Sequence, residues 1–211
     1  MGEAGERMKL LGLSDQTNPF VHSSEIADKF ADIDLIVGCG DLPADYLEYI
    51  VSMLDVPLVY VPGNHDPDDI DIPGGLNIDG RMVQVKGLHI IGMGGSRRYK
   101  DEGIHQYNEN QMKIRMYSLF PKLFYHRMVS KVRIDLFVTH SPPYGIHDAK
   151  DVAHTGFTVF RDIIGYSRAR MMLHGHSHAT RNLEITESSF QGCTILNVYP
   201  YRVVELDAEI N

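Results

Sequence analysis

Apolar runs that end in polar or turn-forming residues recur along the first third of this 211-residue chain. The runs and the polar residues that follow them are 10–13 with Asp15, 35–40 with Asp41, and 57–61 with Asn64, His65 and Asp66. Continuous apolar runs of this length, closed by Gly, Pro or Asp, are typical of strands that are buried on both faces. The pattern therefore predicts three buried strands.

Amphipathic segments separate these runs. Residues 24–31 and 44–54 place apolar side chains at helical spacing, with polar positions between them. Strands that alternate with helices indicate βαβ units and a parallel sheet. We therefore expect an α/β fold.

The middle of the chain has a different pattern. Residues 81–95 predict two strands with a turn at 86–87, and residues 108–131 predict helix. The apolar positions at helical spacing in the second segment are Met112, Met116, Leu119 and Leu123. Pro121 interrupts them, so we expect two helices or one kinked helix, with this stripe packed in the core.

Strands followed by polar loops return in the last third of the chain. Residues 136–139 lead into His140, and residues 170–173 lead into the segment 174–178, which carries three histidines. Residues 194–206 predict antiparallel strands around a short turn.

Composition is that of an ordinary globular protein, with 43% hydrophobic and 23% charged residues. No linker or fixed-period repeat is visible, so we expect one domain over residues 1–211, with residues 1–8 as a disordered leader. No apolar stretch approaches the ~20 residues that span a bilayer, so no membrane partner is expected. Cys39 and Cys193 lie in apolar runs without a secretory signal, which favours buried, reduced thiols and a cytoplasmic location.

The formal net charge of −8 bears on the kind of partner. Proteins that grip nucleic acid along its backbone usually present a basic face, so a long nucleic acid is an unlikely partner. A carboxylate-rich site that binds divalent cations would account for part of the acidic balance.

The position of the polar residues is the most informative feature of the chain. Asp15, Asp41, the segment 64–66, His140 and the segment 174–178 each follow a strand-like run. Ligands of α/β sheets bind beyond the carboxyl ends of strands, so these five loop ends should meet in one crevice.

The donors in these loops are carboxylates, an amide and imidazoles, without a thiolate. Such a set suits Mn, Fe, Zn or Ni better than a zinc–thiolate site. It exceeds the needs of one tetrahedral ion and suits two divalent metal ions about 3.5–4 Å apart, which activate a hydroxide and clamp a phosphoryl group.

These motifs, in this order, resemble the calcineurin-like metallophosphoesterase superfamily. The residues that carry the resemblance are Asp15, Gly40-Asp41, Gly63-Asn64-His65-Asp66, His140 and Gly175-His176-Ser177-His178. It covers residues from about 9 to 178. It implies two mixed β-sheets packed as a sandwich and flanked by helices, in four layers.

The resemblance also implies roles for these side chains. Asp41 would bridge two metal ions; Asn64, His140 and His176 would bind one of them, and Asp15 and His178 the other. His65 would be the catalytic residue that stabilises the phosphoryl charge and protonates the leaving group. Asp66 would orient the loop or His65.

One motif departs from the family. Its first motif carries a histidine two residues after the aspartate, and this chain reads Asp15-Gln16-Thr17. The ion beside Asp15 therefore lacks an imidazole and should bind more weakly. Thr17, a water molecule, His174 or His22 could fill the gap.

Other polar residues fall outside the motifs. His147, Asp148 and His154 could line the mouth of a substrate site, or belong to a solvated loop. Arg97, Arg98 and Lys100 could touch a substrate phosphate, although a solvated charge cluster is the more ordinary interpretation.

The sequence thus predicts a metal-dependent phosphoesterase that hydrolyses a small phosphomonoester or phosphodiester by attack of a metal-activated hydroxide. The alternatives are a non-catalytic binding or scaffold protein that retains the fold and a partial metal site, and a hydrolase of amides or carboxyl esters. Apolar side chains on surface helices would permit a homodimer.

Overall fold

The computed structural model of the chain describes residues 7–178 and 185–207. Its first sheet has five strands in the order β13-β1-β2-β3-β4. Their bounds are β1 Arg7–Leu13, β2 Leu35–Gly38, β3 Leu58–Tyr60, β4 Gly75–Asn77 and β13 Tyr201–Asp207. Strands β1 to β4 are parallel and β13 is antiparallel to β1, so the sheet is mixed.

The second sheet has six strands in the order β11-β12-β10-β9-β6-β5. Their bounds are β5 Arg81–Val85, β6 Leu88–Met93, β9 Leu136–Thr139, β10 Met171–His174, β11 Glu187–Phe190 and β12 Cys193–Asn197. The four inner strands are parallel, and each edge strand pairs antiparallel with its neighbour. Two short strands, β7 Ser96–Arg97 and β8 Gln106–Tyr107, form a separate ladder.

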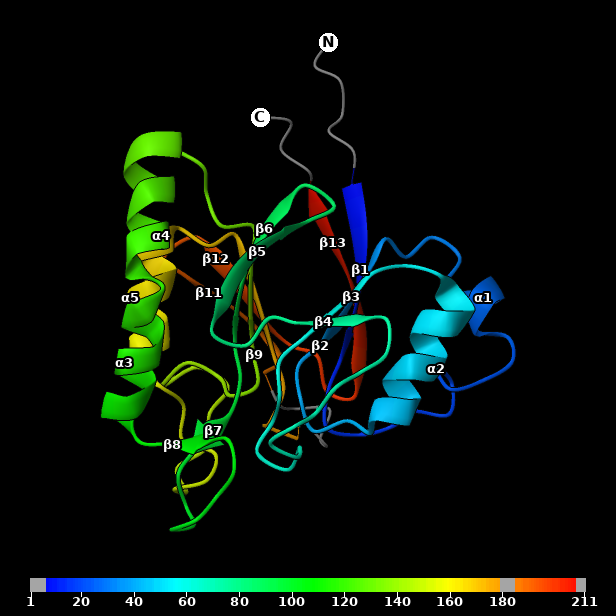
Figure 1. Cartoon of the computed structure of the whole chain (residues 1–211), viewed down its shortest axis with the longest axis horizontal. Helices are drawn as coiled ribbons and strands as arrows, with labels where there is room; N and C mark the ends of the chain where they lie inside the picture. The colour runs from blue at the N-terminus through cyan, green and yellow to red at the C-terminus, as the bar shows by residue number, and fades with distance from the viewer. Residues whose placement is uncertain (1–6, 179–184, 208–211) are drawn as a thin grey trace.

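Helices cover the outer faces of both sheets (Figure 1). They are α1 Ile26–Lys29, α2 Ala44–Leu54, α3 Glu109–Ser118, α4 Phe120–Tyr125, the π-helix η1 His126–Ser130 and α5 Thr158–Ser167. Helix α3 begins with a reciprocal capping box in which Asn108 and Gln111 bond each other's backbone N–H groups.

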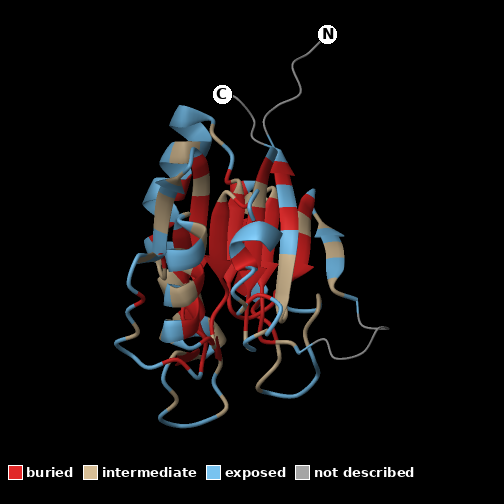
Figure 2. Ribbon diagram, turned by 90° about the vertical axis from the view of Figure 1, so that its right-hand side faces the viewer, coloured by how far each residue is buried: buried red, intermediate tan, exposed pale blue. Residues whose placement is uncertain are grey.

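Three apolar cores separate the four layers. Leu10, Val37 and Val138 belong to the core between the sheets, whose strands are buried along most of their length (Figure 2). A second core joins the first sheet to α1 and α2, and a third joins the second sheet to α3, α4 and α5. This arrangement confirms the predicted sandwich of two mixed sheets flanked by helices.

Most predicted elements are present with small shifts of their ends. The turn at 86–87 joins β5 to β6, and α2 has the predicted bounds. Pro121 lies in the first turn of α4, where its missing N–H costs no helical hydrogen bond, so the segment 108–131 divides into successive helices.

Two predictions need correction. Residues 1–6 of the proposed leader lie outside the described residues, but Arg7 and Met8 belong to β1 and pair with Asp207 and Leu206. The strands predicted within 194–206 do not form a hairpin. β12 lies parallel to β10 in the second sheet, whereas β13 crosses to the first sheet and pairs with β1.

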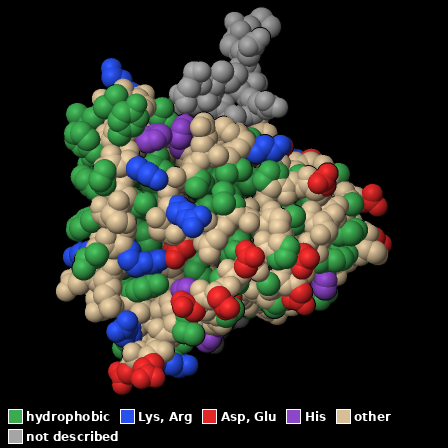
Figure 3. All heavy atoms as spheres, in the orientation of Figure 1, with side chains coloured by type: hydrophobic (Ala, Val, Ile, Leu, Met, Phe, Trp, Pro, Cys, Tyr) green, Lys and Arg blue, Asp and Glu red, His purple; other side chains and the backbone are tan. Residues whose placement is uncertain are grey.

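The surface of the helical layer is partly apolar. Figure 3 shows hydrophobic side chains gathered at the end of the molecule formed by α4 and η1, where Phe124, Met128 and Val129 are exposed. Among the described residues, no helix has the length and apolar character needed to cross a membrane. Cys39 and Cys193 are buried and free, as predicted.

Candidate metal centre

Loops from both sheets meet at the carboxyl ends of the parallel strands. Asp15 follows β1, Asp41 follows β2, His140 follows β9 and His176 follows β10. One ligand atom from each of these four residues lies within 4.8 Å of the other three. The structure therefore brings together side chains that are up to 161 positions apart in sequence.

The backbone at this junction is unusual. Asp15, Asp41 and His176 have left-handed φ angles of 62°, 58° and 65°. Residues other than glycine seldom adopt this conformation, and such strain is characteristic of functional sites. Close approach of the loops also explains two motif glycines. A Cβ atom at Gly63 would lie 2.1 Å from Asp41 Oδ1, and one at Gly175 would lie 2.5 Å from Asp15 Oδ2.

Asp41 and His140 form the buried centre of the cluster. His140 Nε2 lies 3.3 Å from Asp41 Oδ2, and the His140 side chain is fully buried. Burial alone would lower the pKa of His140, but the Asp41 and Asp15 carboxylates raise it to about 9. Burial alone would raise the pKa of Asp41, but His140 and a hydrogen bond from the His65 backbone lower it to about 2. A cation would replace the imidazolium proton as the partner of this carboxylate.

Two further groups orient this side of the cluster. The Cys39 carbonyl oxygen lies 2.8 Å from His140 Nδ1 and can only accept, so Nδ1 carries a proton and Nε2 faces the cluster. Asn64 Oδ1 lies 3.0 Å from His140 Nε2, while Asn64 Nδ2 donates to the Tyr99 hydroxyl at 3.2 Å. The Tyr99 hydroxyl therefore holds the amino end of this amide, while its oxygen faces His140. Sequence reasoning missed Tyr99, whose only signal was its place in a run of basic residues.

The Asp15 side is built differently. Asp15 accepts a hydrogen bond from the His176 backbone N–H at 2.8 Å, and its other oxygen lies 3.3 Å from His178 Nε2. The hydrogen bond to Asp15 raises the pKa of His178, although its side chain is 53% exposed. His176 has its pKa lowered to about 3 by burial and by the nearby His140, so its imidazole is neutral at physiological pH.

His65 lies at the open edge of the cluster. Its backbone N–H donates to Asp41 Oδ1 at 2.7 Å, and its side chain is exposed. Asp66 is buried and accepts from the N–H groups of Gly63 and Asp41 at 2.7 and 2.9 Å. It therefore pins the loop after β3 to the loop after β2.

The gap left by the missing histidine is visible. Thr17 is exposed on the loop after β1. His22 packs on the rings of Tyr49 and Tyr46 of α2, with centroids 4.5 and 5.5 Å away. His174 is held by His147, whose Nδ1 lies 2.9 Å from His174 Nε2. Both imidazoles therefore contact groups outside the cluster.

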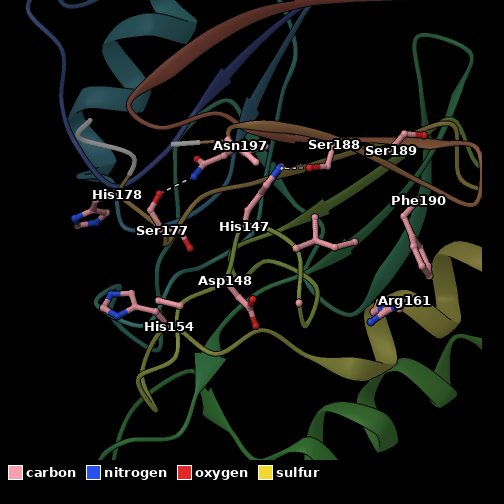
Figure 4. Close-up of a pocket in the computed structure, with 14 residues that line it drawn as sticks. His147, Asp148, His154, Arg161, Ser177, His178, Ser188, Ser189, Phe190 and Asn197 are labelled. Carbon is pink, nitrogen blue, oxygen red and sulfur yellow. Dashed lines mark hydrogen bonds between the residues drawn. The ribbon is translucent and has the colours of Figure 1, made fainter. Parts of the chain in front are cut away.

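A cavity of about 870 Å³ opens beside this side of the cluster. His178 and His154 form part of its wall, and the ring of His154 lies 4.9 Å from that of His176. His147 and Asp148 line it as well, so the loop that could line a substrate mouth does border a cavity (Figure 4). Arg97 instead bonds Glu109 and the Gly156 carbonyl, and Arg98 bonds the Gln106 carbonyl.

The donor set fits a divalent cation. Two carboxylates, two imidazoles and a nearby amide oxygen converge without a thiolate, which matches the ligands of first-row divalent ions. The cluster joins two carboxylates to two histidines, of which His176 is already neutral and His140 must lose one proton to become a ligand.

Known proteins share the sequence or the fold of this chain. The chain is 26% identical over 192 residues to uncharacterized protein MJ1162 of Methanocaldococcus jannaschii, covering 84% of this chain and 83% of that protein. The crystal structure of TT1561 of Thermus thermophilus has a similar fold, with a TM-score of 0.63 at 14% identity over 92% of this chain and 89% of that one. A second solved structure gives a TM-score of 0.63 at 12% identity, over 97% and 100% of the two chains.

The sequence of the chain identifies its family. The sequence model of the calcineurin-like phosphoesterase family matches residues 9–180. This range is most of the chain and includes every loop of the cluster. This chain therefore belongs to the calcineurin-like phosphoesterase family.

Proposed function

We propose that the protein is a metal-dependent phosphoesterase that hydrolyses a small phosphomonoester or phosphodiester. The observation that carries the proposal is the convergence of Asp15, Asp41, His140 and His176 within 4.8 Å. His178, which lies 3.3 Å from Asp15, belongs to the wall of the neighbouring cavity. Bound divalent ions would supply an activated water and Lewis-acid stabilisation of the phosphoryl oxygens.

The side chains have complementary tasks in this proposal. Asp41, Asn64, His140 and His176 would hold one ion, and Asp15 and His178, with Asp41 within reach, would hold a second, weaker one. Mn, Fe, Zn and Ni all suit these donors.

His65 is the residue we assign to proton transfer. Its imidazole is exposed while its backbone is tied to Asp41, so it stands beside the cluster without being part of it. From there it can donate a hydrogen bond to a phosphoryl oxygen and a proton to the leaving alkoxide. Because Asp66 holds the same loop through two N–H groups, the position of His65 is set by the fold.

The first experiment measures hydrolysis of 4-nitrophenyl phosphate and bis(4-nitrophenyl) phosphate with and without Mn²⁺. We expect activity with Mn²⁺, loss of activity with a chelator, and a fall of more than about 100-fold in Asp41→Asn. Asp28→Asn, an exposed carboxylate on α1, is the matched control and should retain activity. Absence of turnover with every divalent metal would contradict the proposal.

A second experiment isolates His65. With an alkyl phosphate, whose leaving alkoxide needs a proton, His65→Ala should lower kcat by about 100-fold or more while leaving the bound metal content unchanged. His22→Ala is the matched control. Equal loss of metal and activity in His65→Ala would make His65 a structural residue.

The exposed Thr17 favours one alternative, a binding protein with a partial metal site and no turnover. Calorimetric titration with Mn²⁺ separates the two. Two occupied sites accompanied by turnover would eliminate the binding protein, whereas one site without turnover would favour it.

Location and assembly follow from the same reasoning. We expect a cytoplasmic protein with a small phosphoester as its ligand, no membrane partner and no long nucleic acid. The exposed side chains of Phe124, Met128 and Val129 suit a homodimer, which sedimentation velocity of the wild type and Phe124→Glu would test.

A further inference from the structure

The cavity beside the metal centre has a built interior. It lies between the loop 145–149, strand β11 and the first turns of α5, and His178 belongs to its wall. Figure 4 shows His178 and His154 at one side of it and Arg161 and Phe190 at the other, with His147 between them. Pockets for organic ligands measure about 300–1,000 Å³, so a volume of about 870 Å³ far exceeds what a bare phosphate needs.

A chain of hydrogen bonds fixes the chemistry of one wall. His174 is fully buried, and its Nδ1 lies 2.9 Å from the Gly175 carbonyl oxygen, so Nδ1 carries a proton. His174 Nε2 then accepts from His147 Nδ1 at 2.9 Å. His147 Nε2 in turn accepts from the Ser188 hydroxyl at 2.9 Å. The Ser188 proton is thereby committed, and its oxygen presents only lone pairs to the cavity.

This chain is held rigidly. His147 has a left-handed φ of 59°, which a residue other than glycine adopts only when its surroundings impose it. Both of its ring nitrogens are engaged, which over-determines the orientation of the imidazole. Asp148, the next residue, also lines the cavity and has one carboxylate oxygen bonded to the Gly156 N–H at 3.1 Å. Ser188 and Asp148 together form an acceptor wall that matches a ligand bearing hydroxyl groups.

The far side of the cavity has the opposite character. The Arg161 guanidinium lies over the Phe190 ring at 4.6 Å, so two flat groups are stacked there. One Arg161 nitrogen donates to the Tyr144 carbonyl oxygen at 3.4 Å, and the guanidinium carries five N–H donors in all. This side matches a planar ligand group that bears carbonyl oxygens or other acceptors.

We propose that this cavity, which we call the Ser188 cavity, binds the organic part of the phosphoester, and that this part is a nucleoside. A sugar hydroxyl faces Ser188 and Asp148, and the planar base lies against Arg161 and Phe190. The proposal rests on the proposed phosphoesterase function for the position of the phosphoryl group, but the nucleoside contacts do not. A mononucleoside is specified rather than a polymer because the chain has a net charge of −8.

The test compares two diesters with the same leaving group, thymidine 5′-(4-nitrophenyl phosphate) and methyl 4-nitrophenyl phosphate, in the presence of Mn²⁺. The ratio of their kcat/KM values isolates the nucleoside contribution. We expect a ratio of about 10 or more in the wild type. Ser188→Ala should lower the ratio about 5-fold and Arg161→Gln about 10-fold, as expected for a neutral and a charge-assisted hydrogen bond.

Matched controls lie on other parts of the surface. Ser24 precedes α1 and Arg81 lies on β5; both residues are exposed and outside the cavity wall. The control variants are Ser24→Ala and Arg81→Gln. These variants should leave the ratio unchanged. A wild-type ratio near 1, or an equal fall of the ratio in the controls, would overturn the proposal.

A second measurement needs neither metal nor turnover. Calorimetric titration of the metal-free protein, prepared with a chelator, with thymidine should give saturable binding. Arg161→Gln should remove this binding and Arg81→Gln should retain it. Thymidine binding without hydrolysis of any ester would support the Ser188 cavity and contradict the phosphoesterase. Hydrolysis of both diesters with a ratio near 1 and without thymidine binding would do the reverse.

Discussion

The two sides of the candidate metal centre differ in how firmly the fold holds their side chains. On the His140 side, the proposed ligand side chains of Asn64, His140 and His176 are buried, and carbonyl and hydroxyl partners orient His140 and Asn64. On the Asp15 side, His178 is half exposed, and position 17 carries an exposed threonine where the family has a histidine.

For the two ions proposed above, the difference predicts unequal affinities. A ligand that is already buried and oriented loses little freedom when an ion binds, whereas an exposed imidazole must be ordered first. We therefore expect the His140 side to fill first and the Asp15 side to fill only at higher metal concentration.

The largest expected effect comes from replacing one histidine on each side by glutamine. His140→Gln should lower kcat/KM at a fixed Mn²⁺ concentration by at least about 100-fold, and His178→Gln by about 10-fold. Metal content of each purified variant, measured by mass spectrometry, should fall in the same order. Equal losses in the two variants would show that the sides are equivalent.

A smaller effect is expected from restoring the missing imidazole. Thr17→His should raise the affinity of the second Mn²⁺ by about 10-fold, because a neutral imidazole replaces a weak hydroxyl ligand. Thr17→Ser is the control and should bind as the wild type does. If calorimetry gives the same second affinity for all three proteins, the Asp15 side is limited by something other than position 17.

The smallest expected effect is the number of protons released when metal ions bind. The pKa of His140 is raised to about 9 by its carboxylate neighbours, so the chelated protein holds this proton at pH 7. The first ion must displace it, and the apparent affinity should rise with pH until about 9 and then level off. Asp41, with its pKa at about 2, and His176, with its pKa at about 3, are already deprotonated at pH 7.

Calorimetry in two buffers of different ionisation enthalpy measures this count. About one proton should leave with the first ion at pH 7, and a further fraction, from His178, should appear only as the second ion binds. The pairing of protonated His140 with its carboxylate neighbours also stabilises the metal-free protein. This stabilisation is fully present below the ordinary histidine pKa and is lost as pH rises through about 9. A first step without proton release would contradict the protonated His140.

The fold was predictable where burial dictates the pattern. Strands β2, β3 and β9 are continuous apolar runs with polar ends, and few structures other than a buried strand produce that pattern. Strand β11, with the sequence ESSF, carries little apolar signal because it lies at a sheet edge. The crossing from β12 to β13 was missed because alternating side chains identify a strand but not its partner.

Some residues of the candidate site were predictable from the sequence and others were not. Asp15, Asp41, Asn64, His140 and the histidines after β10 stand in short motifs that follow strands, so the sequence locates them. The Ser188 cavity draws its walls from a loop, an edge strand and a helix that are distant in sequence. Ser188, Arg161 and Phe190 belong to no motif, and only the three-dimensional structure brings them together.

The left-handed backbone at Asp15, Asp41 and His176 has a consequence for the rate of metal loading. These loops are held in one shape by the sheets behind them and by hydrogen bonds such as that from the His176 N–H to Asp15. Little loop movement should then accompany ion capture, and the slow step becomes the shedding of water by the ion. Mg²⁺, which gives up its water reluctantly, should load more slowly than Mn²⁺ at equal concentration.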